Sequence, residues 1–187
     1  IGLPKTATTA LQRRVFRDFA RQNNRNYWGK RKTSKHIAAL QNADVDIFPL
    51  NDRNIFVSNE RLVGSNPLNW QEYAEKNRVY FGESSTIVLV LREPKSYLRS
   101  IYLQICVHEG RMLKPDEFFV SGKTLDPAAS FDLSSFSYRA LIHHYSSRFN
   151  RVIVQKFETI SDFRLLNTIS PLSEQQRAQY ENEFKRR

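Results

Sequence analysis

The run IVLVL at residues 87–91 is the sequence feature that most limits how this chain can fold. It is too short for a stable helix, and it has no polar residue that could face water. A continuous apolar run of this length is typical of a strand that is covered on both faces, as in parallel sheets flanked by helices. Two further β-rich runs, IFVS at 55–58 and VIVQKF at 152–157, predict additional strands.

Helical patterns separate these predicted strands. Apolar residues recur at helical spacing over residues 8–24, 68–77, 95–107, 136–149 and from 173 to the C-terminus. Strands that alternate with helices predict an α/β fold with a mostly parallel central sheet. Because the chain has no internal repeat and no low-complexity linker, we expect residues 1–187 to form a single domain.

Charge and cysteine content narrow the classes of partner and compartment. The chain has 29 Lys and Arg against 19 Asp and Glu, a formal net charge of +10, which favours an anionic partner. Cys106 is the only cysteine, so no disulfide can form within the chain, and we expect a reducing, cytoplasmic compartment. No apolar run approaches the roughly 20 residues of a membrane-spanning helix. The chain begins without Met, which leaves an upstream targeting segment open.

The opening stretch GLPKTATT, residues 2–9, predicts an anion-binding turn between a strand end at Ile1 and a helix. Backbone N–H groups and the helix dipole converge at such a turn. Lys5 adds a positive charge, and Thr6, Thr8 and Thr9 add hydroxyl donors. The alternative is an ordinary loop in which a threonine caps the helix and Lys5 is solvated.

Neither candidate for a nucleoside triphosphate loop fits the G-x-x-x-x-G-K-[ST] pattern. The opening stretch lacks the pattern, and the tripeptide GKT at 122–124 has Glu117 at the position of the first glycine. We therefore interpret the sequence SGKT at 121–124 as a surface turn.

A second anion motif is predicted where the apolar strand ends. Arg92 follows that strand, Pro94 suits the first position of a helix, and Ser100 lies about two turns into the same helix. The planar fork of Arg and a serine hydroxyl together suit a phosphate monoester. The alternative is an arginine at a sheet edge and a serine packed in a helix.

Together the two motifs resemble the sulfotransferases that use 3′-phosphoadenosine 5′-phosphosulfate. GLPKTATTALQ is similar to the 5′-phosphosulfate loop of that family, and VLVLREPKSYLRSIY is similar to its 3′-phosphate motif. Phe157, Glu158 and Ile160 in VIVQKFETI resemble the end of a late strand of the family. The resemblance spans most of the chain and implies a P-loop-like three-layer sandwich. It also implies that the donor contacts Pro4, Lys5, Thr6, Ala7, Thr8, Thr9, Arg92 and Ser100.

Three departures from the family pattern affect these expectations. Ala7 stands where the family often has glycine, which restricts positive φ angles in the loop. The basic, glycine-rich loop that covers the nucleotide in the family has no counterpart before Arg187, so the resemblance does not account for one wall of the adenine pocket. The first strand is represented by little more than Ile1, so we expect the domain to extend beyond both ends of this sequence.

The resemblance implies in-line transfer of a sulfuryl group to an acceptor hydroxyl or amine, with adenosine 3′,5′-bisphosphate as the product and no metal ion. Lys5 would stabilise charge on the leaving oxygen, and Arg92 and Ser100 would hold the 3′-phosphate. A general base must take the acceptor proton. Glu60 is our first choice because it follows a predicted strand, and His36 and His108 are the reserves.

The stretch 23–36, NNRNYWGKRKTSKH, combines two aromatic residues with five cations. It suits an acceptor that stacks a sugar ring and carries anionic groups, and it would also suit single-stranded nucleic acid or be a solvated basic loop. We expect a polar acceptor, a glycan in particular, and no nucleic acid. The rival classes are a basic nucleic-acid-binding module and a P-loop nucleotide kinase. A kinase would need a complete triphosphate loop and an acidic magnesium ligand after a strand, and this sequence shows neither clearly.

Overall fold

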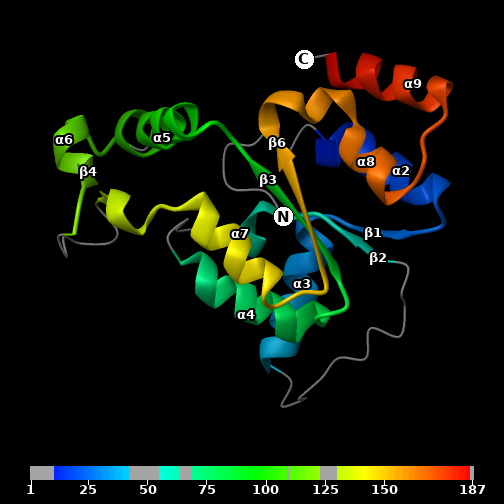
Figure 1. Cartoon of the computed structure of the whole chain (residues 1–187), viewed down its shortest axis with the longest axis horizontal. Coiled ribbons are helices and arrows are strands. Elements are labelled where there is room, and N and C mark those ends of the chain that lie inside the picture. The colour runs from blue at the N-terminus through cyan, green and yellow to red at the C-terminus, as the bar shows by residue number, and fades with distance from the viewer. Residues whose placement is uncertain (1–10, 43–54, 64–68, 109, 123–129, 186–187) are drawn as a thin grey trace.

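The computed structural model describes residues 11–42, 55–63, 69–108, 110–122 and 130–185. Their elements, in chain order, are η1 Gln12–Phe16, α2 Arg17–Gln22, β1 Asn26–Trp28, α3 Lys30–Asn42, β2 Ile55–Val57, η2 Glu60–Val63, α4 Trp70–Phe81, β3 Thr86–Leu91, α5 Pro94–Tyr102, η3 Leu103–His108, α6 Pro115–Phe118, β4 Phe119–Val120, β5 Phe131–Asp132, η4 Leu133–Ser135, α7 Tyr138–Ser146, β6 Arg151–Lys156, η5 Phe157–Asp162, α8 Arg164–Ile169 and α9 Glu174–Lys185. Helices alternate with parallel strand pairs, so the fold is α/β (Figure 1).

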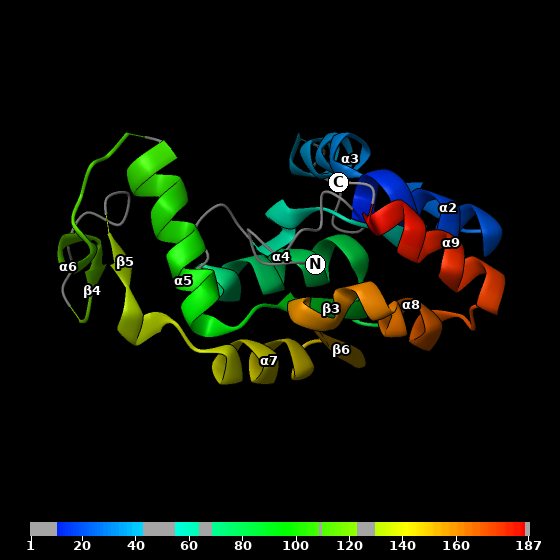
Figure 2. The same cartoon turned by 90° about the horizontal axis from the view of Figure 1, so that it is seen from above.

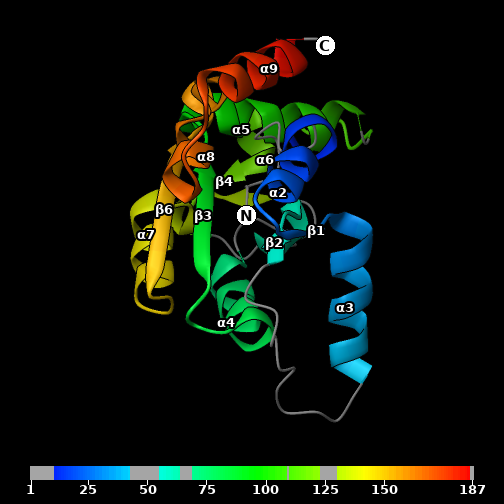
Figure 3. The same cartoon turned by 90° about the vertical axis from the view of Figure 1, so that its right-hand side faces the viewer.

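Strand β3 pairs in parallel with β6 and lies at the centre of the packing (Figure 3). The two strands are in register from Thr86 opposite Arg151 to Leu91 opposite Lys156, so they begin and end together. Ile87, Leu89 and Leu91 face a cluster built from α4, α5 and α7. Val90 faces a second cluster built from η1, α2, η5, α8 and α9. The apolar run therefore has a hydrophobic layer on each side, which confirms the prediction that it is covered on both faces.

A second parallel pair joins β1 to β2, with Asn26 opposite Ile55 and Trp28 opposite Val57. Phe56 is packed against the second cluster, and its ring lies 5.3 Å from that of Phe16 and 5.8 Å from that of Phe19. These edge contacts fasten the short strand pair to η1 and α2. A third, two-residue pair, β4 with β5, is also parallel.

The predicted strands and most of the predicted helices are confirmed, with shifted boundaries. The strands at 55–58, 87–91 and 152–157 are β2, β3 and β6, and the helices at 68–77, 136–149 and 173 onward are α4, α7 and α9. The helix expected over 95–107 begins as α5 and continues as the π-helical η3. Within the described part of the helix expected over 8–24, a π-helical segment, η1, leads into α2.

Two parts of the chain extend away from the β3–β6 pair. Residues 23–36, which the sequence left open as a basic loop, form a turn, strand β1 and the start of α3. Helix α3 stands at the edge of the molecule (Figure 3). On the other side, α5, α6, β4 and β5 form an arm that leads away from the carboxyl end of β3 (Figures 1 and 2). Tyr102 on α5 fastens the arm, because its hydroxyl donates to the Leu113 carbonyl at 2.8 Å.

Candidate functional site

Arg92 is the first residue after β3 and stands at the carboxyl end of the β3–β6 pair. Its side chain is half-buried, and its guanidinium carbon lies 5.1 Å from the centre of the Phe157 ring. Phe157 is the first residue after β6, so two strands that are neighbours in the sheet supply the cation and the ring beneath it. A guanidinium over an aromatic face is held there by the quadrupole of the ring.

The backbone beside Arg92 is fixed by a side chain from a distant element. The carboxylate of Glu158, in η5, accepts a hydrogen bond of 2.8 Å from the N–H of Glu93. We call Arg92 with Phe157 and Glu158 the arginine clamp. It fixes the guanidinium against a ring and the backbone of the residue that follows.

Glu93 continues the clamp into helix α5. Its carboxylate caps the helix, accepting from the N–H groups of Lys95 at 3.0 Å and Ser96 at 2.6 Å. These two bonds hold the pKa of Glu93 below its ordinary value, and the bond from Ser96 has the larger effect. Pro94 occupies the first turn, where its missing N–H costs nothing. The turn after Arg92 therefore leads directly into a well-capped helix.

Ser100, the second residue predicted for the 3′-phosphate motif, lies in the last turn of α5 and is half-buried. Ser96 and Ser100 are one turn apart, so they share a stripe of the helix that starts beside the capping carboxylate. The neighbouring stripe carries Tyr97 and Ile101, which are buried in the first cluster. Ser100 is about 9 Å along the helix axis from Pro94.

A second set of contacts gathers at the carboxyl end of the β1–β2 pair. The N–H of Ser58 donates to the Trp28 carbonyl at 3.0 Å, and the Gln12 side-chain amide donates to the Ser58 hydroxyl at 3.1 Å. The Tyr27 hydroxyl reaches the Gln12 carbonyl at 3.4 Å, and burial raises the pKa of that hydroxyl to about 12. These bonds join η1 to the ends of both strands.

The three candidate bases fall on three different elements. Glu60 begins η2, two residues after Ser58, at the end of the β1–β2 pair. His36 lies in α3, and His108 is the last residue of η3. The α5–η3 helix places the backbone of His108 roughly 20 Å from the start of α5, by the rise per residue. The predicted loop residues Pro4, Lys5, Thr6, Ala7, Thr8 and Thr9 lie outside the described residues.

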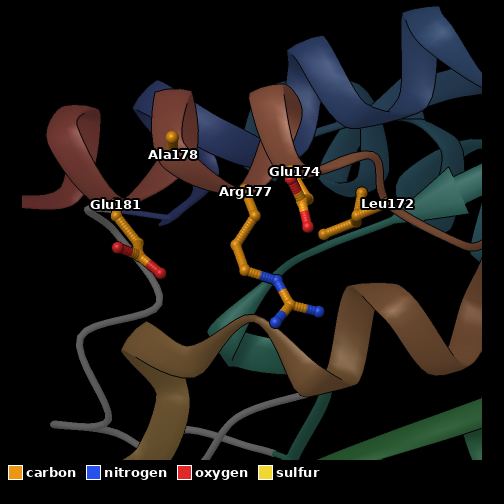
Figure 4. A pocket seen from close by; sticks show the side chains of 5 residues that line it. All are labelled: Leu172, Glu174, Arg177, Ala178 and Glu181. Atoms are coloured by element: carbon orange, nitrogen blue, oxygen red, sulfur yellow. The ribbon is translucent and has the colours of Figure 1, made fainter.

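A pocket of about 410 Å³ lies beside α9 and was not predicted from the sequence. Figure 4 shows Arg177 extending from α9 toward the ribbon that runs below it, with Glu174 and Glu181 on either side. Leu172 and Ala178 complete the lining. The sequence did contain one sign of this pocket, because three of its charged lining residues recur along one face of a helix: Glu174, Arg177 and Glu181. The mixture of one cation and two carboxylates is less suited to a phosphate than the arginine clamp is.

The SGKT sequence, interpreted above as a surface turn, is described at its first two residues. Gly122 sits in an exposed bend, at φ +65°, and its N–H donates to Asp132 at 3.2 Å.

Across the described ranges, no group of three or more His, Cys, Asp or Glu side chains could hold a metal ion. Nor is any described helix both long and apolar enough to cross a membrane.

Comparison with protein-family models, with curated proteins and with solved structures finds no match to this chain.

Proposed function

We propose that the chain is a sulfotransferase that moves a sulfuryl group from 3′-phosphoadenosine 5′-phosphosulfate to a hydroxyl or amine of a polar acceptor, on a P-loop-like three-layer sandwich. The observation that carries the proposal is the arginine clamp. A half-buried arginine is fixed at the carboxyl end of a parallel strand pair by Phe157 and Glu158. Ligands of open α/β sheets bind at this end of the strands.

The donor fits the residues around the clamp. A phosphate at the 3′ position carries up to two negative charges and accepts hydrogen bonds in the plane that an arginine fork offers. Arg92 would make the charged contact, and Ser100, on the same face of α5 as the capped turn, would add a hydroxyl donor. Because the guanidinium already lies over the Phe157 ring, Arg92 would lose less side-chain freedom on binding than a solvated arginine.

The other half of the donor site rests on the sequence motif at residues 2–9. Lys5 would neutralise charge that develops on the bridging oxygen as its bond to sulfur breaks, and Thr6, Thr8 and Thr9 would hold the 5′-phosphate. The helix that follows this stretch supports the assignment, because Leu11 and Val15 pack in the same cluster as Val90 of β3. This packing places the helix after the motif against the strand that Arg92 follows.

The acceptor hydroxyl would lose its proton to Glu60 as its oxygen attacks sulfur. Support comes from the bonds of Ser58, which join the strand before Glu60 both to the end of β1 and to η1. His36 and His108 remain the alternatives. His108 is the weaker of the two because the length of the α5–η3 helix separates it from the clamp.

Calorimetry with adenosine 3′,5′-bisphosphate, adenosine 5′-monophosphate and Mg·ATP tests the proposal. We expect the bisphosphate to bind most tightly. Arg92→Ala should weaken bisphosphate binding by about 2–4 kcal/mol and monophosphate binding much less, because one charge-assisted contact is lost. The matched control is Arg151→Ala, an exposed arginine at the opposite end of the same strand pair, which should leave both affinities unchanged.

Two results would contradict the proposal. Tighter binding of Mg·ATP than of the bisphosphate, with turnover of ATP, would favour a nucleotide kinase. Equal losses for both adenine nucleotides in Arg92→Ala would mean that Arg92 holds the fold rather than the 3′-phosphate.

A further inference from the structure

Helix α3 has an exposed basic face near its amino end. Lys30, Arg31, Lys32 and Lys35 are all exposed, and we call these four residues the α3 basic face. They account for four of the first six residues of the helix. The first turn contains no acidic residue.

These cations stand where a helix disfavours positive charge. The amino end of a helix carries a partial positive charge, so a cation there is electrostatically unfavourable. The ion pairs found among the described residues involve Arg21, Lys76, Arg78, His144, Arg148 and Arg164, and none involves the α3 basic face. The charges are therefore not compensated within the described part of the chain, which is the arrangement expected of a surface that meets an anion.

The shape of the surface favours an extended anion over a small one. Arg31 and Lys35 are one turn apart, and Lys32 is three residues before Lys35, so their side chains form a row along the helix. Helix α3 stands at the edge of the molecule, clear of the β3–β6 pair (Figure 3). A linear polymer can therefore lie along such a row.

The surface is connected to the proposed acceptor site. Trp28 ends β1, only two residues before the helix begins, and its carbonyl accepts from Ser58, just before Glu60. A chain held along α3 would therefore pass close to the strand end that carries the proposed base.

We propose that the α3 basic face binds an anionic polysaccharide, so that the acceptor already carries carboxylate or sulfate groups when it reaches the enzyme. This inference rests on the proposed sulfotransferase function and names the class of its acceptor. It also implies that a preceding reaction, an oxidation to uronic acid or an earlier sulfation, has placed charge on the polymer.

The aromatic contacts favour polysaccharide over single-stranded nucleic acid. Nucleic acid without sequence preference is held by stacking successive bases on several aromatic side chains. Here the Lys32 ammonium lies 5.0 Å from the centre of the Trp28 ring, so a cation occupies one face of that ring. The described side chains of α3 that are exposed are Lys, Arg and Ser, which offer charge and hydrogen bonds but no stacking surface.

The test compares charge reversal on α3 with charge reversal elsewhere. Binding of the whole chain to heparin, to neutral dextran and to a single-stranded oligonucleotide would be measured at several salt concentrations. Arg31→Glu with Lys35→Glu should weaken heparin binding by about tenfold or more and reduce its salt dependence. The control, Lys114→Glu with Arg151→Glu, makes the same change in net charge at exposed sites away from α3 and should lose less than about threefold. Dextran should not bind.

Three results would overturn the inference: equal losses in the two double variants, no loss in the α3 variant, or tighter binding of the oligonucleotide than of heparin at the same salt. Arg31→Ala with Lys35→Ala, which keeps good helix formers, should show a smaller loss in the same direction. Binding of adenosine 3′,5′-bisphosphate is measured separately on every variant. If the bisphosphate does not bind the parent chain while heparin binds through α3, the proposed transfer reaction fails and the polysaccharide surface stands.

Discussion

The carboxyl ends of the two longer strand pairs both present cations, but they hold them in opposite ways. At the end of β3 and β6, a single arginine lies on an aromatic ring, and a carboxylate from η5 binds the backbone of the next residue. At the end of β1 and β2, four exposed cations project from the start of α3 without an ion pair among the described residues. One arrangement fixes a single charge and the other repeats a charge along a row.

This difference matches the two kinds of anion proposed above. A fixed, partly desolvated guanidinium discriminates by position, so it suits one phosphate of a small ligand. A row of solvated cations is screened by salt and tolerates variation in the spacing of its partner's charges, so it suits a polymer. The proposed transferase would bind a small donor and a long acceptor, and it would therefore need both arrangements.

The largest effect should come from the strand that supports the clamp. Leu89→Ala removes a side chain that is 2% exposed in the first cluster, and should lower the free energy of unfolding by about 2–5 kcal/mol. Val154→Ala, on β6 at 45% exposure, should lower it by less than about 0.5 kcal/mol. Urea unfolding of both variants measures the difference, and similar losses would contradict the central position of β3.

A smaller effect, on ligand affinity, should show whether the carboxyl ends of the two strand pairs act independently. Glu158→Ala removes the acceptor for the Glu93 N–H, so bisphosphate affinity should fall by about 1 kcal/mol while heparin affinity stays unchanged. Glu158→Gln keeps an acceptor oxygen and should recover most of the loss. Glu72→Ala, an exposed carboxylate on α4, is the control and should change neither affinity. A parallel fall in heparin affinity would show that the two ends are not independent.

The smallest effect concerns acid pH. Because the Ser96 and Lys95 N–H groups hold the pKa of Glu93 below its ordinary value, its cap is complete above the ordinary glutamate range. The cap is then lost as pH falls through the lowered pKa. The amide resonances of Lys95 and Ser96 should titrate in that acid range, and Glu93→Gln should abolish the titration. The first turn of α3 has no acidic residue, so its amides should not follow the same curve.

The layering around β3 could be predicted from sequence because it depends on local pattern. The apolar run IVLVL and the helical spacing on either side were enough to predict a strand covered on both faces. Arg92 and its helix could be placed as well, since Pro94 and the strand end mark the turn. The position of Glu60 after a strand was also predictable, because β2 is strongly β-branched and aromatic.

The contacts that complete the two ends could not be predicted in this way. Glu158 binds a backbone group 65 residues away, and nothing near it in sequence distinguishes it from a solvated carboxylate. Strand β1 is three residues long and depends on its pairing with β2 and on the Phe56 ring. Four cations in six residues indicate a solvated loop, yet Lys, Arg, Ala, Leu and Gln all favour helix, and α3 forms from them.

The pairing of β3 with β6 also bears on the order in which the chain folds. The hydrogen bond between Glu93 and Glu158 joins residues that are 65 positions apart in the sequence. It can form only after β6 has paired with β3. Non-local parallel pairing of this kind is slow, whereas a helix such as α3 forms from neighbours along the chain. We therefore expect the proposed donor site to be among the last parts to assemble. A nucleotide that binds there selects completely folded molecules, and at a hundred times its dissociation constant it would add about 2.7 kcal/mol to their stability.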